Sequence, residues 1–354
     1  GVEGQGSGIS EEGLRKQVAL PDYEFEYLRF LPDGRPAAGT FDGWPDSLKE
    51  FTMLDPCCGS GHFLVEAFNL LVPMRIHNEG LSAQDTCDAV LVENLFGLEL
   101  DPRCTQIAAF ALALAAWKFR GESGEPLGYR PLPPLNIACS GQSVTGKKEE
   151  WLALANGDGR LHEGMSKLYD LFGQAPHLGS LIDPRGEIGD MFTAGFSELH
   201  PLLDKALARE AIKIDADASA VGVAAQGITK AAELLAAQYT LIATNVPFLA
   251  RGKQSSVLTS FGEDRHELSK ADLATMLIER SIHFCRKDGT VAVVSPQNWL
   301  FLASYKQMRE RLLKSGKWQL IVKLGPNAFQ DMNWWAAITQ LCILSESSWP
   351  NIHE

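Results

Sequence analysis

A short apolar run that ends in an acid and a glycine turn constrains the fold of this 354-residue chain more than any other feature. Residues 51–54 are largely apolar, Asp55 follows them, and Gly59-Ser60-Gly61 leads into an amphipathic run over 63–71. This order predicts a strand, a tight loop and a helix. Glycine fits where a backbone turns sharply or approaches a ligand closely, because it lacks a Cβ. Such loops follow the strands of open α/β sheets, where cofactors bind.

Length, charge and cysteine content narrow the class of protein. The chain can bury a large core, as one domain with an insertion or as two domains. A net charge of −12 argues against a broad nucleic-acid-binding surface, so any DNA contact must use a local basic patch or parts outside this chain. The seven cysteines show neither a zinc-binding nor a disulfide pattern, and no apolar run reaches the roughly 18 residues of a membrane span. We therefore expect a cytoplasmic protein without a metal site or a membrane segment.

A second strand is predicted over 95–101, where apolar residues again end in acids. Pro102 cannot continue a strand ladder and marks its end. In dinucleotide-binding folds an acid beyond the glycine loop binds the ribose, and one carboxylate can accept hydrogen bonds from both ribose hydroxyls. Glu99 is therefore the candidate for a cofactor ribose. Its alternative role is to cap the next helix, for which Asp101 is the better candidate. The helix predicted over 104–119 is unusually apolar, which favours burial against the sheet.

Residues 145–237 contain no strand pattern and separate a third predicted strand, over 133–139, from a fourth over 239–244. Helical periodicity recurs in this segment over 151–156, 165–172, 202–209 and 229–238. The segment is too long for a simple loop, so we interpret it as a helical insertion. A lid, a domain contact and a docking face are all compatible with its sequence.

The fourth strand ends in Asn245-Val246-Pro247-Phe248, the second motif of the chain. Alone, this tetrapeptide is compatible with a strand-ending turn. An amphipathic helix over 272–280 and a strand over 290–294 follow it. Two last strands are predicted over 318–324 and 336–344, as an antiparallel pair at the sheet edge. A polar loop after the motif carries basic residues that either contact phosphates or are simply solvated, namely Arg251, Lys253, Arg265, His266 and Lys270.

Both motifs resemble those of one enzyme family. The run Asp55-Pro56-Cys57-Cys58-Gly59-Ser60-Gly61-His62-Phe63-Leu64 resembles the S-adenosylmethionine loop of the amino-methyltransferases, chiefly DNA adenine-N6 methyltransferases. Asn245–Phe248 is similar to their Asn-Pro-Pro-Tyr/Phe motif. The chain looks most like the large bacterial enzymes of restriction–modification or phage-defence systems, including PglX-type methylases, whose upstream pattern Gly43-Trp44-Pro45 matches. This resemblance implies an α/β, Rossmann-like class I methyltransferase fold with a mixed, mostly parallel sheet.

The resemblance also implies the residues of the site. Those expected to bind S-adenosylmethionine are Asp55, Pro56, Gly59, Gly61, Phe63, Glu99 and Gln142. Those expected to act on the target amine are Asn245, Val246, Pro247 and Phe248, and Phe329 is expected either to pack on the target base or to fill the loop core. Because the amine of adenine is conjugated with its ring, two acceptors are needed to orient its lone pair. The Asn245 side-chain oxygen and the Val246 carbonyl would supply them, by positioning and electrostatics.

Two residues depart from the family pattern. Gln142 stands where an acid usually bonds the adenine amino group of the cofactor; its carbonyl can still accept, without charge. Val246 stands where proline is usual, so Asn245 loses a conformational restriction, although Val246 itself still precedes Pro247. Reduced or absent methyl transfer is therefore an alternative to full activity, while cofactor binding is expected to be retained.

The resulting domain assignment has four parts: an N-terminal extension over 1–45, a cofactor-binding half over 46–144, the helical insertion over 145–237 and a catalytic half over 238–354. The resemblance implies methyl transfer to adenine in DNA, with a target-recognition domain and nuclease or defence-system subunits as further partners. A methyltransferase acting on RNA or on protein glutamine, and a cofactor-binding module with weak catalysis, are the alternatives.

Overall fold

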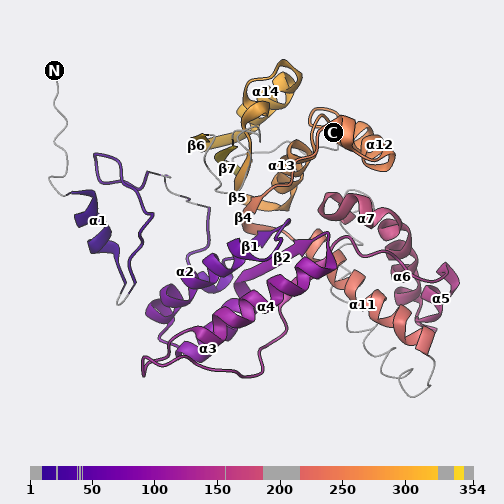
Figure 1. The fold of residues 1–354 in the computed structure, drawn as a ribbon, viewed down its shortest axis with the longest axis horizontal. Helices are drawn as coiled ribbons and strands as arrows, with labels where there is room; N and C mark the ends of the chain where they lie inside the picture. The colour runs from indigo at the N-terminus through magenta and orange to yellow at the C-terminus, as the bar shows by residue number, and fades with distance from the viewer. Residues whose placement is uncertain are drawn as a thin grey trace.

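A seven-stranded sheet with helices on both faces forms the centre of the computed structural model (Figure 1). The structure describes residues 10–20, 23–37, 39, 41, 43–155, 157–185, 216–325 and 339–346. The strands are β1 (Met53–Asp55), β2 (Leu95–Glu99), β3 (Asn136–Cys139), β4 (Tyr239–Asn245), β5 (Cys285–Pro296), β6 (Gly316–Gly325) and β7 (Thr339–Glu346).

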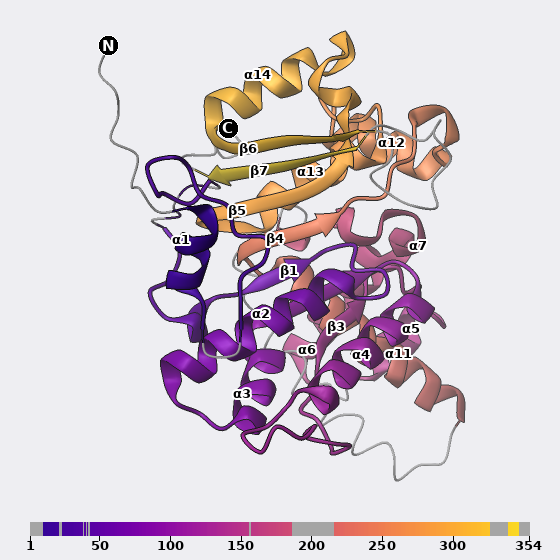
Figure 2. The ribbon, with the colours of Figure 1, turned by 60° about the vertical axis from the view of Figure 1, so that its left-hand side comes forward.

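The strand order across the sheet is β3-β2-β1-β4-β5-β7-β6. Strands β1 to β5 pair in parallel, and β7 runs antiparallel to both β5 and β6. Figure 2 shows the strands stacked from β6 to β3. The α/β fold with a mixed, mostly parallel sheet is thus confirmed. The expected pairing of the last two strands is also present, but β7 lies inside the sheet and β6 is at the edge.

Strand order reverses between β1 and β4. The chain leaves β1 toward β2 and β3 on one side of the sheet, and it returns at β4 to pair with β1 on the other side. In open α/β sheets ligands bind outside the carboxyl ends of the strands at such a switch point. The two sequence motifs follow β1 and β4, and therefore meet at this edge.

One face of the sheet is covered by α2 (His62–Glu79), α3 (Ala83–Ala89) and α4 (Pro102–Lys118), with a π-helical turn over Val90–Asn94. Their core contains Met53 of β1 and Phe68 of α2. Helix α4 is less buried than its apolar sequence predicts: Ile107 and Phe110 are 53% and 60% exposed. Its small residues face the core instead, where Ala108 lies against the glycine loop.

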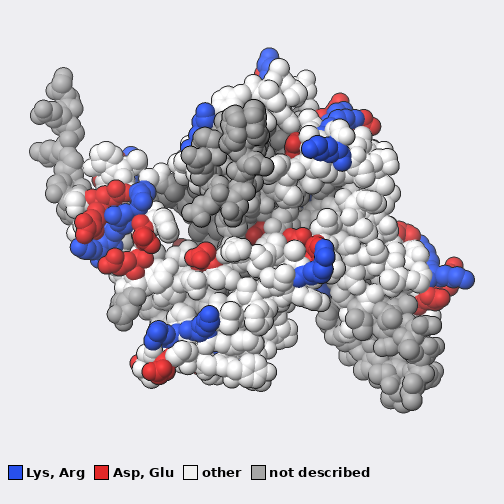
Figure 3. Space-filling model, viewed as in Figure 1, with Lys and Arg blue, Asp and Glu red and all other residues white. Residues whose placement is uncertain are grey.

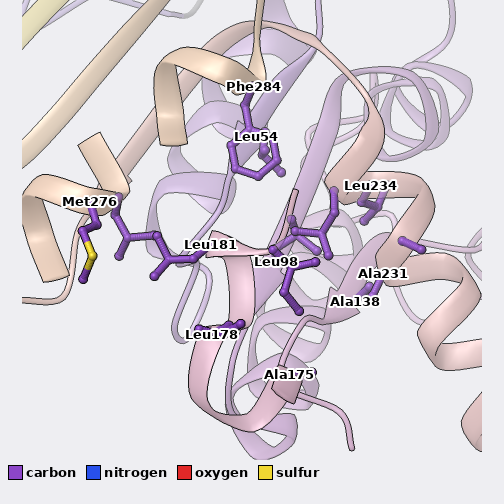
Figure 4. Packing of buried hydrophobic residues seen from close by; sticks show 14 of the residues in the cluster. Leu54, Leu98, Ala138, Ala175, Leu178, Leu181, Ala231, Leu234, Met276 and Phe284 are labelled. Atoms are coloured by element: carbon purple, nitrogen blue, oxygen red, sulfur yellow. The ribbon is translucent and has the colours of Figure 1, made fainter. Parts of the chain in front are cut away.

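The opposite face is covered by α5 (Lys148–Ala153), α6 (Gly159–Leu171), α7 (Ala175–Leu178), α11 (Ala216–Ala236), α13 (Leu273–Phe284) and α14 (Lys306–Ser315). Figure 4 shows their shared core, in which Leu54 and Leu98 of the sheet pack with Leu181, Leu234 and Phe284. The described part of 145–237 is helical and belongs to this core. The helix predicted over 202–209 lies outside the described residues.

The remaining elements are peripheral. Helix α1 (Glu11–Val18) precedes a loop whose Trp44 Nε1 donates to the Thr290 hydroxyl at 3.0 Å and whose Phe41 stacks on Trp44. Helix α12 (Ser256–Arg265) follows the second motif, and short 3-10 turns occur at Leu48–Glu50, Phe172–Gln174, Gly179–Leu181, Arg251–Lys253, Gln297–Leu300 and Ala303–Tyr305. Among the helices described here, none is long and apolar enough to cross a membrane.

Candidate functional site

Asp55 lies at the end of β1, 1% exposed, between the glycine loop and β4. One of its carboxylate oxygens accepts the amide N–H of Cys57 at 3.1 Å. Burial raises the pKa of Asp55 to about 7, because it disfavours the charged form; the Thr244 hydroxyl and the Cys57 amide act against this. Thr244 is on β4, so the Asp55 carboxyl lies between the two motif-bearing strand ends.

The glycines of the loop have different structural roles. Gly61 has φ +87°, and a Cβ there would lie 3.0 Å from the Ala108 backbone of α4, so its lack of a side chain lets α2 begin against α4. Gly59 has φ +53°, and a Cβ there would meet nothing within 4 Å. The backbone at Gly59 thus borders open space that a ligand can occupy. Phe63, in the first turn of α2, is 36% exposed beside this loop.

Glu99 closes the loop from the neighbouring strand. Its carboxylate accepts the N–H of Gly59 at 2.8 Å, and also the N–H groups of Leu100 at 2.8 Å and Asp101 at 3.1 Å. Asp101, and not Glu99, caps α4, through the N–H of Arg103. A carboxylate has about four acceptor positions, so three backbone bonds leave limited capacity. The expected bond from Glu99 to a ribose remains a prediction, and the structure adds a loop-holding role.

The second motif begins on the last residue of β4. Asn245 pairs in register with Val294 of β5, and its side chain is exposed. The Val246 N–H donates to the Val294 carbonyl at 3.2 Å, and its side chain is in the core at 1% exposure. Pro247 is exposed and Phe248 is 46% exposed. The motif therefore presents one polar and one aromatic side chain at the sheet edge next to Asp55.

Gln142 Nε2 donates to the Ala224 carbonyl of α11 at 3.3 Å, and a Cβ on Gly227 would lie 2.4 Å from Gln142 Oε1. Its side chain thus lies against α11, and its bond to a cofactor adenine stays a prediction. Phe329 lies outside the described residues.

Sequence reasoning missed two serines that support the loop. Ser180, from the 3-10 turn Gly179–Leu181, donates to the carbonyl of Pro56 at 2.5 Å, and its oxygen is 3.2 Å from that of Ser140, after β3. Both serines are buried. No local pattern distinguishes them, since 124 residues separate Ser180 from Pro56.

Three of the five basic residues after the motif lie beside acidic side chains in the described part of the chain. His266 is 4% exposed, with Nδ1 2.9 Å from a Glu279 oxygen, so it is not available to a phosphate. Arg251 pairs with Glu263, and Arg265 with Asp264. On the face shown in Figure 3, Lys and Arg form small groups separated by neutral and acidic residues.

Comparison with known proteins identifies the family of this chain. Residues 40–299 match the family described as MmeI, DNA-methyltransferase domain. The chain is 28% identical over 316 residues to the adenine-specific methyltransferase PglX of Lacticaseibacillus casei (strain Zhang), covering 87% of this chain and 25% of that protein. It is 29% identical over 313 residues to the adenine-specific methyltransferase BrxX of Escherichia coli O9:H4 (strain HS), covering 82% and 24%.

The chain thus spans about a quarter of the length of these curated relatives. Among solved structures, the ATP-dependent type ISP restriction-modification enzyme LlaBIII bound to DNA aligns with a TM-score of 0.49 and 14% identity, over 90% of this chain and 17% of that one. The family match covers well over half of the sequence and includes both motifs, and this chain therefore belongs to the MmeI-type DNA-methyltransferase domain family.

Proposed function

We propose that this chain transfers a methyl group from S-adenosylmethionine to the N6 amine of a flipped adenine in DNA, as the modification part of a restriction or phage-defence system. The observation that carries the proposal is the meeting of two strand ends at the switch point. The loop after β1 and Asn245–Phe248 after β4 lie side by side, with Thr244 of β4 beside the Asp55 carboxyl. Adenine-specific relatives that match most of the chain support the choice of substrate.

The residues of the first motif fit the cofactor. Open space borders the Gly59 backbone, which suits the close approach of a ligand. Asp55 and Glu99, which accept backbone N–H groups of this loop, would supply carboxylates for the cationic amino-acid end and for the ribose. When bound, S-adenosylmethionine supplies a methyl group on a positively charged sulfur.

The residues of the second motif fit the amine. The Asn245 side-chain oxygen and the Val246 carbonyl would each accept one amine hydrogen, which directs the nitrogen lone pair away from the ring system. Phe248 would stack on the base, for which its 46% exposure is suitable. The target amine is paired inside a duplex, so the base must leave the stack to reach this site. Catalysis of this kind consists of positioning and electrostatics.

The acidic balance and the scattered basic groups suggest that this chain contributes little affinity for DNA by itself. We therefore propose that a target-recognition domain elsewhere in the full polypeptide supplies DNA affinity. We further propose that the protein is cytoplasmic and works with nuclease or defence-system partners. The isolated chain should bind the cofactor and hold DNA weakly. Tight, sequence-specific DNA binding by the isolated chain would contradict this part of the proposal.

Two measurements test the proposal. Calorimetry with S-adenosylmethionine should give binding to the wild type and a large loss for Asp55→Ala; unchanged binding would remove the cofactor assignment. Transfer of labelled methyl groups should then be measured with DNA, RNA and protein substrates, with Asn245→Ala as the inactive control. Label in RNA or protein would replace the DNA assignment. Cofactor binding without transfer to any substrate would favour a binding module. The two departures from the family pattern, Val246 and Gln142, which contacts α11, are the reason to test for this outcome.

A further inference from the structure

The hydrogen-bonded ladder between β4 and β5 ends at the second motif, where the next bond of the parallel pattern is missing. Asn245 pairs with Val294, and the Val246 N–H donates to the Val294 carbonyl. In a parallel ladder the next bond would run from the N–H of residue 296 to the Val246 carbonyl oxygen. Residue 296 is proline and has no N–H. The end of β4 at Asn245 thus follows from a residue on the neighbouring strand.

The position of Pro296 is fixed by its other contacts. Pro296 pairs with Thr339 of β7, and the side chain of Trp299 donates to the Ser295 hydroxyl at 3.1 Å. Ser295 and Trp299 are both buried. These contacts hold the β5 backbone from the side of β7, opposite Val246. Pro296, which has no N–H, therefore keeps its place beside the second motif.

The Val246 carbonyl oxygen has no replacement donor among the residues that the structure describes. Val246 as a whole is 1% exposed, so solvent does not supply one freely. Buried carbonyls are nearly always hydrogen-bonded, and an unpaired one costs about 1–3 kcal/mol. An unpaired acceptor directly after Asn245 is suited to a ligand that brings its own donor.

We propose that Pro296 is a positioning residue for the target amine: by withholding an N–H, it keeps the Val246 carbonyl oxygen available as the second acceptor beside the Asn245 side chain. This inference rests on the proposed function. It assigns Pro296 a role in methyl transfer without contact to the cofactor or the base. Pro296 acts because it cannot donate a hydrogen bond to the Val246 carbonyl.

Pro296→Ala tests the inference, because it restores the N–H. The crystal structure of this variant should show the backbone nitrogen of residue 296 about 2.9 Å from the Val246 carbonyl oxygen. Single-turnover methyl transfer should fall roughly a hundred- to a thousandfold, the scale seen when one preorganised hydrogen-bonding group is lost. The Kd for S-adenosylmethionine should not change, since the first motif is untouched.

Two further variants make the comparison specific. Lactic acid at position 296, which has the alanine side chain but an ester oxygen in place of the N–H, should regain the wild-type transfer rate. Pro126→Ala, at a proline that pairs with Arg120 in an isolated bridge, should leave transfer unchanged.

The inference is overturned if Pro296→Ala forms the new bond while transfer stays at the wild-type rate, if no bond forms, or if the ester variant is as slow as Pro296→Ala. Failure of the proposed function is recognised separately, by an Asn245→Ala variant that transfers methyl groups at the wild-type rate. The crystallographic result does not depend on turnover, so it reports on the carbonyl in either case.

Discussion

The hydroxyl of Ser180 donates to the carbonyl of Pro56, 124 residues away in the chain and 2.5 Å away in space. A hydroxyl has one hydrogen, so the Ser140 hydroxyl, 3.2 Å from Ser180, must be the donor in the second bond. The direction of the network is therefore Ser140 to Ser180 to Pro56. It connects the end of β3 and the inserted helical segment to the glycine loop.

Replacing Ser180 by alanine should weaken cofactor binding. The Pro56 carbonyl would lose its donor in a buried place, which costs about 1–3 kcal/mol of stability. Because Pro56 is next to Asp55, the loop should also lose its fixed position, and we expect the Kd for S-adenosylmethionine to rise by about tenfold, equivalent to roughly 1.4 kcal/mol. Calorimetry and thermal unfolding measure the two effects.

Ser315→Ala is the matched control for this prediction. Ser315 is 3% exposed and donates to the Arg311 carbonyl at 2.7 Å, but within α14. It should leave cofactor affinity unchanged, and it should lose less stability, because the Arg311 carbonyl lies within the backbone hydrogen-bonding pattern of α14. Equal Kd values for the two variants would show that Ser180 is structural and has no positioning role.

Glu99→Gln should open the glycine loop. The carboxylate accepts three backbone N–H groups, including that of Gly59, whereas an amide offers one oxygen and turns an N–H₂ group toward the others. We expect faster amide exchange at Gly59 and at least a tenfold rise in the Kd for S-adenosylmethionine, on the scale of a lost charge-assisted bond. Asp101→Asn serves as the comparison, since asparagine remains a good helix cap. If Gly59 exchange stays slow in Glu99→Gln, the loop-holding role is wrong.

Asp55 should make cofactor affinity depend on pH. Its pKa is raised to about 7 by burial, and the ionised form attracts the cationic amino group of S-adenosylmethionine. The wild-type Kd should therefore fall as pH rises from about 6 to about 8, across the pKa of this carboxyl. Asp55→Asn cannot ionise and should show only the weaker dependence due to the cofactor itself. Parallel pH curves for the two proteins would contradict the assignment.

The same carboxyl should affect stability in the opposite direction. A pKa near 7 in the folded state, against 3.8 for the unfolded chain, means that the folded state holds the proton more tightly. The associated stability is present below about pH 4 and is lost as pH rises through about 7, by on the order of 4 kcal/mol. Without cofactor, denaturation of the wild type across this pH range should show the decline, and Asp55→Asn should not.

The two motif-bearing strand ends are predictable from sequence because their signals are local. The apolar run, the acid and the glycines over 51–61 specify strand and turn within a few residues, and Asn245 follows a β-branched run in the same way. Parallel pairing then brings both ends to one edge. Glu99 is predictable as a site residue for the same reason, because it ends a local strand pattern. Its three hydrogen bonds to backbone N–H groups are not predictable from that pattern.

Features that depend on distant partners are not predictable in this way. The apolar composition of α4 indicates burial, but periodicity does not say how much of a helix a neighbour covers, and Phe110 is exposed. Lys287-Asp288-Gly289 has the composition of a turn, and Asp288 adopts φ +63° where the pairing with β4 shifts from Cys285 to Thr290. The sequence does not show that β5 also pairs with β4 before this turn, at Cys285. Ser180 reaches Pro56 across a segment without any pattern that links them.

Val246→Pro should reduce stability although it restores the residue usual in the family. Val246 donates its N–H to the Val294 carbonyl and packs its side chain in the core. Proline removes the N–H and so leaves the Val294 carbonyl without its donor. Its restriction of the Asn245 backbone adds little, since Asn245 is already held in β4. Val246→Ala keeps the N–H and loses only packing. In urea denaturation, we expect Val246→Pro to be less stable than Val246→Ala by about 1–3 kcal/mol. A proline variant at least as stable as the alanine variant would mean that this bond contributes nothing and that β4 tolerates the family residue unchanged.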